Sequence, residues 1–175
     1  MPLVILVAGL VTGCGHRESQ NLAVSPESVS SKELFERVTK EFHIPSAEAK
    51  GAERLRLQNQ ATAGYQELLK RFPNDEYWAA QALRSLGNIY AAQTNLDAAV
   101  REYQLVAKRY PKQEWEVLMA WKSSADLLWE ANRHAEANQF YGKIVERFDG
   151  AESAQVVKVV VHGSKLRLSG VDVAG

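Results

Sequence analysis

Apolar residues in the middle of the chain recur with the spacing of α-helices. Within residues 80–113 they stand three and four positions apart, which places them on one face of a helix. They are Leu83, Leu86 and Tyr90, followed by Ala99, Tyr103 and Val106. The polar run Gln93-Thr94-Asn95 separates the two groups, and Pro111 cannot continue the second helix. The pattern predicts two helices joined by a turn.

The second of these helices has counterparts 38 residues before and after it. An alanine is followed four residues later by a tyrosine, then by an aliphatic residue and an Arg-aromatic pair. The positions are Ala61, Ala99, Ala137; Tyr65, Tyr103, Tyr141; Leu68, Val106, Ile144; Arg71, Arg109, Arg147; and Phe72, Tyr110, Phe148. Pro73 and Pro111 close two copies, and Asp149 replaces the third proline. Such repeats bury a shared core by stacking.

Residues Leu83, Leu86-Gly87, Tyr90, Ala99, Tyr103 and Pro111 resemble the signature of the tetratricopeptide repeat. The resemblance implies an all-α, right-handed stack of tetratricopeptide-like helical hairpins, a short α-solenoid with capping helices, over residues 30–168. Residues 80–113 form the best copy and 118–149 a degenerate one. Ala47 to Asn59 lacks a turn signal, which favours one long helix running into Gln60–Phe72.

Both ends of the repeats carry terminal signals. Ser30 and Glu33 predict a capping box and a helix through Phe42. We expect Ile44-Pro45 to end that helix and Ser46 to cap the next. Glu152 to Leu168 has two interpretations: its valine run favours a strand, whereas the repeat register places a helix there. We predict a helix that caps the last hairpin, because a lone strand would have no sheet partner; residues 169–175 should fray.

The N-terminal sequence predicts that the protein is targeted to a membrane. Leu3 to Val11 is too short to span a bilayer but has the length of a signal-peptide core. It ends Leu10-Val11-Thr12-Gly13-Cys14, which resembles the lipobox of bacterial lipoproteins. That resemblance implies a signal peptide over residues 1–13 and a lipid, diacylglycerol with an added acyl chain such as palmitate, on Cys14.

Two details refine this prediction. No Lys or Arg precedes the apolar run, and a start codon assigned too far downstream would explain the difference. Gly15, where other lipoproteins carry Asp, implies an outer membrane location facing the periplasm. Residues 14–29 are mostly polar and predict a flexible tether.

Composition argues against several function classes. The charges balance, with 21 Lys and Arg against 21 Asp and Glu, so general nucleic-acid binding is not expected. Four scattered histidines form no catalytic or metal-binding motif, and no phosphate loop or nucleophile elbow occurs. We therefore expect no enzyme activity, no cofactor, no metal and no small-molecule substrate.

The repeat resemblance implies an inner groove lined by the first helix of each hairpin. Its predicted residues are Gln81, Arg84, Asn88, Met119, Lys122, Asp126 and Trp129. In related repeats this groove receives an extended peptide or a partner helix, and aromatic and Arg residues contribute most to such contacts. The alternative interpretation is that these residues simply face solvent. Trp121 falls on a packing position, so we assign it to the core.

These features together predict a periplasmic, membrane-anchored scaffold that binds an envelope protein or peptide. The arrangement resembles outer-membrane-assembly lipoproteins and cell-division coordinators, which implies a role in envelope or outer-membrane protein assembly. One alternative is a structural homo-oligomeric envelope spacer. Another is an accessory subunit of an enzyme encoded in the same operon.

Overall fold

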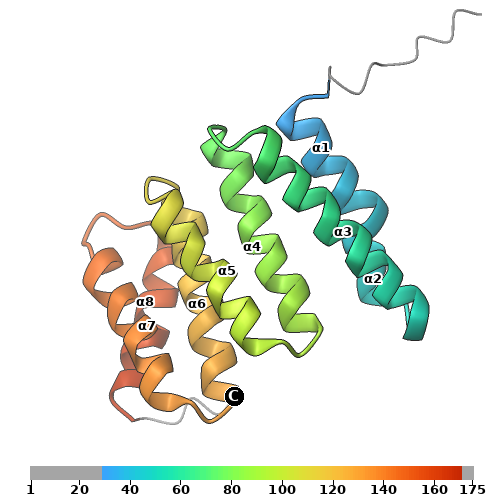
Figure 1. Ribbon diagram of the computed structural model, residues 1–175. Helices are drawn as coiled ribbons and strands as arrows, with labels where there is room; N and C mark the ends of the chain where they lie inside the picture. Colours follow the sequence, from blue (N-terminus) through green and yellow to red (C-terminus); the bar gives the residue numbers. More distant parts are fainter. Residues whose placement is uncertain (1–28, 171–175) are drawn as a thin grey trace, which may run out of the picture.

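The computed structural model describes residues 29–170, and these form helices joined by short connections (Figure 1). The predicted signal peptide 1–13, Cys14, the tether up to residue 28 and residues 171–175 lie outside the described part. Within the described residues, no helix combines the length and apolar character needed to cross a membrane.

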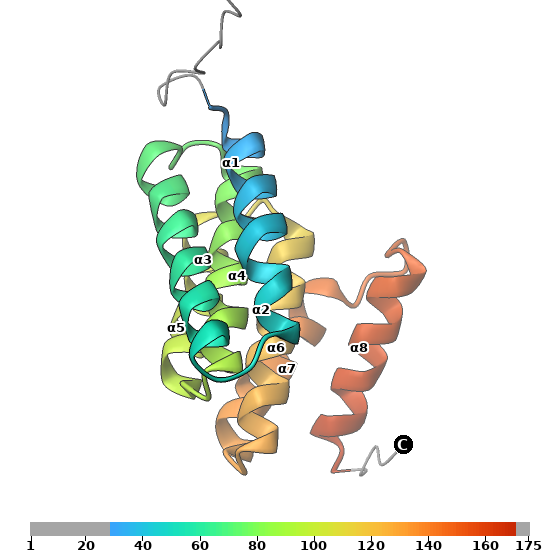
Figure 2. The same cartoon turned by 90° about the vertical axis from the view of Figure 1, so that its right-hand side faces the viewer.

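The helices form a stack of hairpins, as the repeat predicted. They are α1 (Ser31–Val38), the π-helical turn η2 (Thr39–His43), α2 (Ile44–Glu48), α3 (Gly51–Arg71), α4 (Glu76–Ala92), α5 (Leu96–Arg109), α6 (Glu114–Glu130), α7 (His134–Phe148) and α8 (Gln155–Leu168). The hairpins α4–α5 and α6–α7 are the two best repeat copies. Because α1 contacts α4 and α4 contacts α6, these first helices line one side of the stack (Figure 2).

The repeated residues form the core. Ala61, Ala99 and Ala137 are fully buried, and so are the tyrosines and aliphatic residues that follow them in each copy. Close packing depends on small residues: a methyl group at Gly87 would overlap the ring of Tyr103. The helix-spaced sequence therefore predicted the core of all three hairpins correctly.

The turns inside the two hairpins share one backbone conformation. Thr94 and Asn132, equivalent in the repeat, both adopt φ of 59°, the left-handed region that L-residues rarely enter. After the first turn, the Asn95 side chain caps α5 by accepting a bond from the Ala98 amide at 3.3 Å. The turn predicted at Gln93-Thr94-Asn95 is confirmed.

The N-terminal helix differs from prediction at its end. The capping box is present, with the Ser30 amide donating to Glu33 and the Glu33 amide donating to the Ser30 hydroxyl. The prediction that Ile44-Pro45 ends the helix is wrong. The π-helical turn η2 leads directly into α2, and Pro45 sits in the first turn of α2, where its missing N–H is tolerated. Ser46 caps no new helix; its hydroxyl donates to the His43 carbonyl at 2.6 Å.

The first hairpin is made from α1 and α3. We expected residues 47–59 to supply the first half of this copy, or to run on into the second; the single 21-residue helix α3 fulfils the second expectation from Gly51 onward. Val38 on α1 packs against Gly64 on α3. The Tyr65 hydroxyl lies 2.8 Å from the Thr39 hydroxyl. Thus α1 acts as the first helix, and α2 lengthens the connection.

The C-terminal segment is helical, as the repeat register predicted. Within α8, Val161 and Ser164 are buried, and the helix packs mainly on α7. The Ser164 hydroxyl is satisfied by the Val160 carbonyl at 2.9 Å. Burial at helical spacing on one face outweighs the β-propensity of the valine run, and the described residues contain no strand.

Stability should depend on the protonation of His43. Its Nδ1 lies 2.9 Å from the Tyr65 hydroxyl, and burial, with a smaller effect of Arg84, lowers its pKa from the usual 6.5. The unfolded chain binds this proton more readily than the folded chain does. The contribution of neutral His43 to the free energy of unfolding is therefore complete above about pH 6.5, and it is lost as the pH falls through the lowered folded pKa. In urea unfolding between about pH 7 and 5, His43→Gln should show a flatter pH dependence than wild type. The exposed His162→Gln is the control, and equal slopes for wild type and His43→Gln would contradict the prediction.

Candidate protein-binding groove

The predicted groove residues lie on two neighbouring helices. Gln81, Arg84 and Asn88 are on α4; Met119, Lys122, Asp126 and Trp129 are on α6. All seven are partly exposed, and α4 contacts α6. The two sets differ in what their side chains already bind.

On α4 two of the three side chains, those of Arg84 and Asn88, are engaged within the protein. Arg84 Nε lies 2.5 Å from Glu116 Oε2, and Glu116 is buried at the start of α6. Asn88 Oδ1 accepts a hydrogen bond from the Tyr103 hydroxyl at 2.7 Å. This part of the face holds α4 to its neighbours, and its Arg84 has a structural partner.

In every hairpin the core tyrosine bonds a polar side chain from an earlier helical segment of the same hairpin. Tyr65 bonds to Thr39, Tyr103 to Asn88, and the Tyr141 hydroxyl donates to Asp126 Oδ1 at 2.9 Å. Burial, and secondarily the Asp126 carboxylate, raises the pKa of Tyr141 above its ordinary value. Tyrosine at this position therefore fills the core and also fixes a polar side chain above it. Sequence reasoning assigned only the core role.

Between α6 and α8 the surface is hollowed. We define the α6–α8 groove by two rows at helical spacing: Trp115, Leu118, Lys122, Asp126 and Trp129 on α6, and Val157, Val160, Ser164 and Arg167 on α8. Three pockets, of about 510, 270 and 280 Å³, are lined along these rows. Three of the predicted residues, Lys122, Asp126 and Trp129, line this groove.

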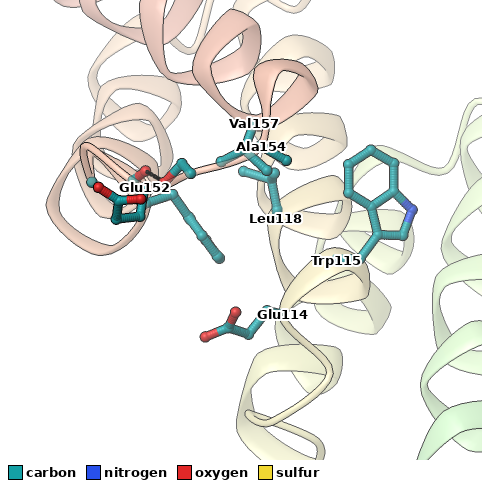
Figure 3. Close-up of a pocket in the computed structure, with 9 residues that line it drawn as sticks. Glu114, Trp115, Leu118, Glu152, Ala154 and Val157 are labelled. Atoms are coloured by element: carbon teal, nitrogen blue, oxygen red, sulfur yellow. Dashed lines mark hydrogen bonds between the residues drawn. The ribbon is translucent and has the colours of Figure 1, made fainter.

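The largest pocket lies where α6 and α8 begin. Figure 3 shows Leu118, Ala154 and Val157 together at its apolar wall, with the carboxylates of Glu114 and Glu152 on its rim. Trp115 stands to one side and is 45% exposed, unusual for a tryptophan without a partner surface. This end of the groove is apolar inside and acidic at the rim.

The opposite end is aromatic and carries charges of both signs, because Asp126 and Glu130 line it together with Lys122 and Arg167. The ring of Trp129 stacks on His134 with centroids 4.2 Å apart, and the Arg167 guanidinium carbon lies 4.7 Å from the Trp129 centroid. Such a cation–π contact orients the guanidinium. In the middle, Lys122 Nζ bonds Asp126 Oδ2 at 2.5 Å. The groove is thus acidic at the rim of its apolar end and mixed in charge at its aromatic end.

The second wall of the groove was missed by the sequence prediction. Val157, Val160, Ser164 and Arg167 stand 38 residues after Met119, Lys122, Asp126 and Trp129. Extending the repeat register by one more step would have found them. The described residues contain no cluster of side chains suited to hold a metal ion. The arrangement is one that can bind a polypeptide segment.

Comparison with known families agrees with the hairpin geometry. Residues 78–112, which include most of α4 and all of α5, match the tetratricopeptide repeat family. This segment is therefore similar to one tetratricopeptide repeat. No curated protein matches the chain. Tetratricopeptide repeats are typically non-catalytic modules that bind other proteins, and this supports a protein-interaction scaffold.

Proposed function

We propose that this protein is a lipid-anchored scaffold of the bacterial envelope that holds a partner protein in the α6–α8 groove. The observation that carries the proposal is the groove itself, which is open, apolar at its base and flanked by tryptophans at both ends. Buried aromatic and Arg side chains dominate the energetics of protein–protein contacts. A role in envelope or outer-membrane protein assembly belongs to this proposal.

The groove has the dimensions of a peptide site. The 17-residue helix α6 forms one wall, so the groove is roughly 25 Å long at 1.5 Å per residue. That length accommodates a short amphipathic helix or an extended segment. Pockets of this kind, at intervals along a groove, accept side chains that recur on one face of a ligand.

Charge gives the bound segment a direction. Glu114 and Glu152 stand at one end, where no cation lines the pocket, whereas Arg167 and Glu130 both line the other end. A segment with a cation near the acidic rim would be favoured over the reversed orientation. Complementary charges of this kind contribute mainly to specificity and to the rate of association.

The groove should be required for partner recovery. After cross-linking in membranes, much less partner protein should be recovered with Trp115→Ala or Trp129→Ala than with wild type. Each substitution removes an aromatic contact from the groove. Leu55→Ala, a change at a 53% exposed apolar residue on α3, is the matched control and should recover the same partners. Circular dichroism checks that all variants are folded. Unchanged recovery by both tryptophan variants would remove the groove from the proposal.

The anchor should depend on one residue. Our proposal places a lipid on Cys14, because the preceding residues have the lipobox pattern. We expect Cys14→Ser to move the protein from the membrane to the soluble fraction, since a single acyl chain or none binds membranes weakly. His16→Ser is a control that should stay membrane-bound. Retention of Cys14→Ser in membranes would contradict lipidation and leave the groove proposal intact.

A further inference from the structure

One stripe of α8 is apolar and uncovered. Val156 and Val159 are 52% and 62% exposed, and Gly163 lies on the same side of the helix. Figure 2 shows α8 at the edge of the stack. Val159 and Gly163 also line the groove pocket that contains Lys122 and Asp126. We call these three residues the α8 stripe.

The repeat identifies what normally covers such a stripe. Ala80, Leu83 and Gly87 on α4 stand two repeat lengths before Val156, Val159 and Gly163. On α4 the same stripe is closed: Ala80 is 0% exposed and Leu83 1%. Gly87 lies against the Tyr103 ring of α5, whereas a methyl group at Gly163 would meet nothing within 4 Å. Helix α8 therefore corresponds to the first helix of a fourth hairpin, and the described residues provide no second helix.

We infer that a helix of the partner protein packs on the α8 stripe and supplies the second helix of this fourth hairpin. The inference rests on the proposed scaffold function and specifies its ligand. By analogy with α5, the incoming helix carries a small residue and, four positions later, an aromatic residue that packs over Gly163. It would lie at the open side of the α6–α8 groove.

A second copy of the chain is a poor source for this helix. The described helices with the Ala-x-x-x-Tyr pattern are α3, α5 and α7, and their tyrosines are already buried in their own hairpins. Pairing of two α8 helices would also bring like charges together. The helix contains Lys158, Lys165 and Arg167 and no carboxylate.

The same charges specify the incoming helix further. Lys165 bonds Asp149 at 2.6 Å, and Lys158 is exposed beside the stripe. Opposite charges across an interface favour association, and like charges disfavour it. The partner helix is therefore amphipathic, with carboxylates flanking its small and aromatic residues.

A synthetic peptide with the sequence of residues 94–111, which contains α5, is a defined probe. Fluorescence anisotropy would measure its binding to the full-length chain carrying Cys14→Ser. We expect the peptide variant Tyr103→Ala to bind at least tenfold more weakly. A peptide with Arg101→Glu and Lys108→Glu should bind several-fold more tightly at low salt.

Changes in the protein locate the site. Val159→Asp should weaken binding at least tenfold, and Leu55→Asp on α3 should not change it. Gly163→Ala places a methyl group where the aromatic ring of the incoming helix would lie, without a clash in the free protein. It should therefore weaken peptide binding, while the midpoint temperature of thermal unfolding stays unchanged or rises. A peptide that instead replaced α5 within its own hairpin would be insensitive to Gly163→Ala.

Three results would overturn the inference. They are no binding up to millimolar peptide, equal binding to wild type and Val159→Asp, or a homodimer in light scattering that Val159→Asp abolishes. If Trp115→Ala still loses partners in membranes while the peptide ignores α8, the groove proposal stands and only this inference fails.

Discussion

Replacing Tyr103 by alanine should lower the free energy of unfolding by about 3–5 kcal/mol, the usual cost of removing a buried aromatic side chain. Tyr103 is buried between α4 and α5, its ring lies over Gly87, and its hydroxyl bonds Asn88. Gly87 has no side chain to fill the space, so the cavity cannot close easily. Urea unfolding followed by circular dichroism measures the change.

Two further variants test this prediction, one for the hydroxyl and one as an exposed control. Tyr103→Phe keeps the ring and should lose only about 1 kcal/mol for the hydrogen bond to Asn88. Tyr77→Ala, at a 53% exposed tyrosine on α4, should change stability by less than about 0.5 kcal/mol. If Tyr103→Ala is no more destabilising than Tyr77→Ala, the result would contradict the assignment of Tyr103 to the hairpin core.

Removing Arg84 should destabilise the fold more than an exposed arginine would. Glu116 is buried, and its carboxylate bonds Arg84, which connects α4 to the first turn of α6. Arg84→Ala leaves that carboxylate buried without its partner, a loss of about 3 kcal/mol, at the lower end of the range because Arg84 is partly exposed. Urea unfolding again provides the measurement.

A double variant tests the cause. Arg84→Met with Glu116→Leu replaces the pair by apolar side chains of similar size and should recover most of the loss. Arg101→Ala, at an exposed position on α5, is the single-charge control and should be close to wild type. A double variant as unstable as Arg84→Ala alone would show that the ion pair is not the cause. Either way, Arg84→Ala is an unsuitable probe of partner binding, because it alters the fold itself.

The hairpins could be predicted because their signal is local and repeated. Alanine, tyrosine and aliphatic positions recur at helical spacing in three copies, and each copy buries the same positions. The helix end at Ile44-Pro45 was predicted wrongly for a non-local reason. Pro45 is accommodated by the π-helical turn before it, and that turn lies where Thr39 and His43 both bond Tyr65, 22 or more residues away.

The groove was predicted only in part for similar reasons. Repeat position placed Lys122, Asp126 and Trp129 on the face of α6 that lines the α6–α8 groove. It could not show that Arg84 is bound to Glu116, because that pair joins residues 32 apart on different helices. The wall formed by α8 was within reach of the sequence, since Arg167 follows Trp129 by one repeat length. It was missed because the valine-rich segment was considered only as a cap.

The two left-handed turns differ in how well their residues tolerate that backbone conformation. Asn132 tolerates its φ of 59° well, because asparagine is among the non-glycine residues most often found there, whereas Thr94 adopts the same angle with a β-branched side chain. Two loops of identical shape are therefore unequally suited to their sequences. Thr94→Asn should therefore increase the stability of the fold. Natural proteins commonly lack such stabilising residues, because they need only remain above a threshold of stability.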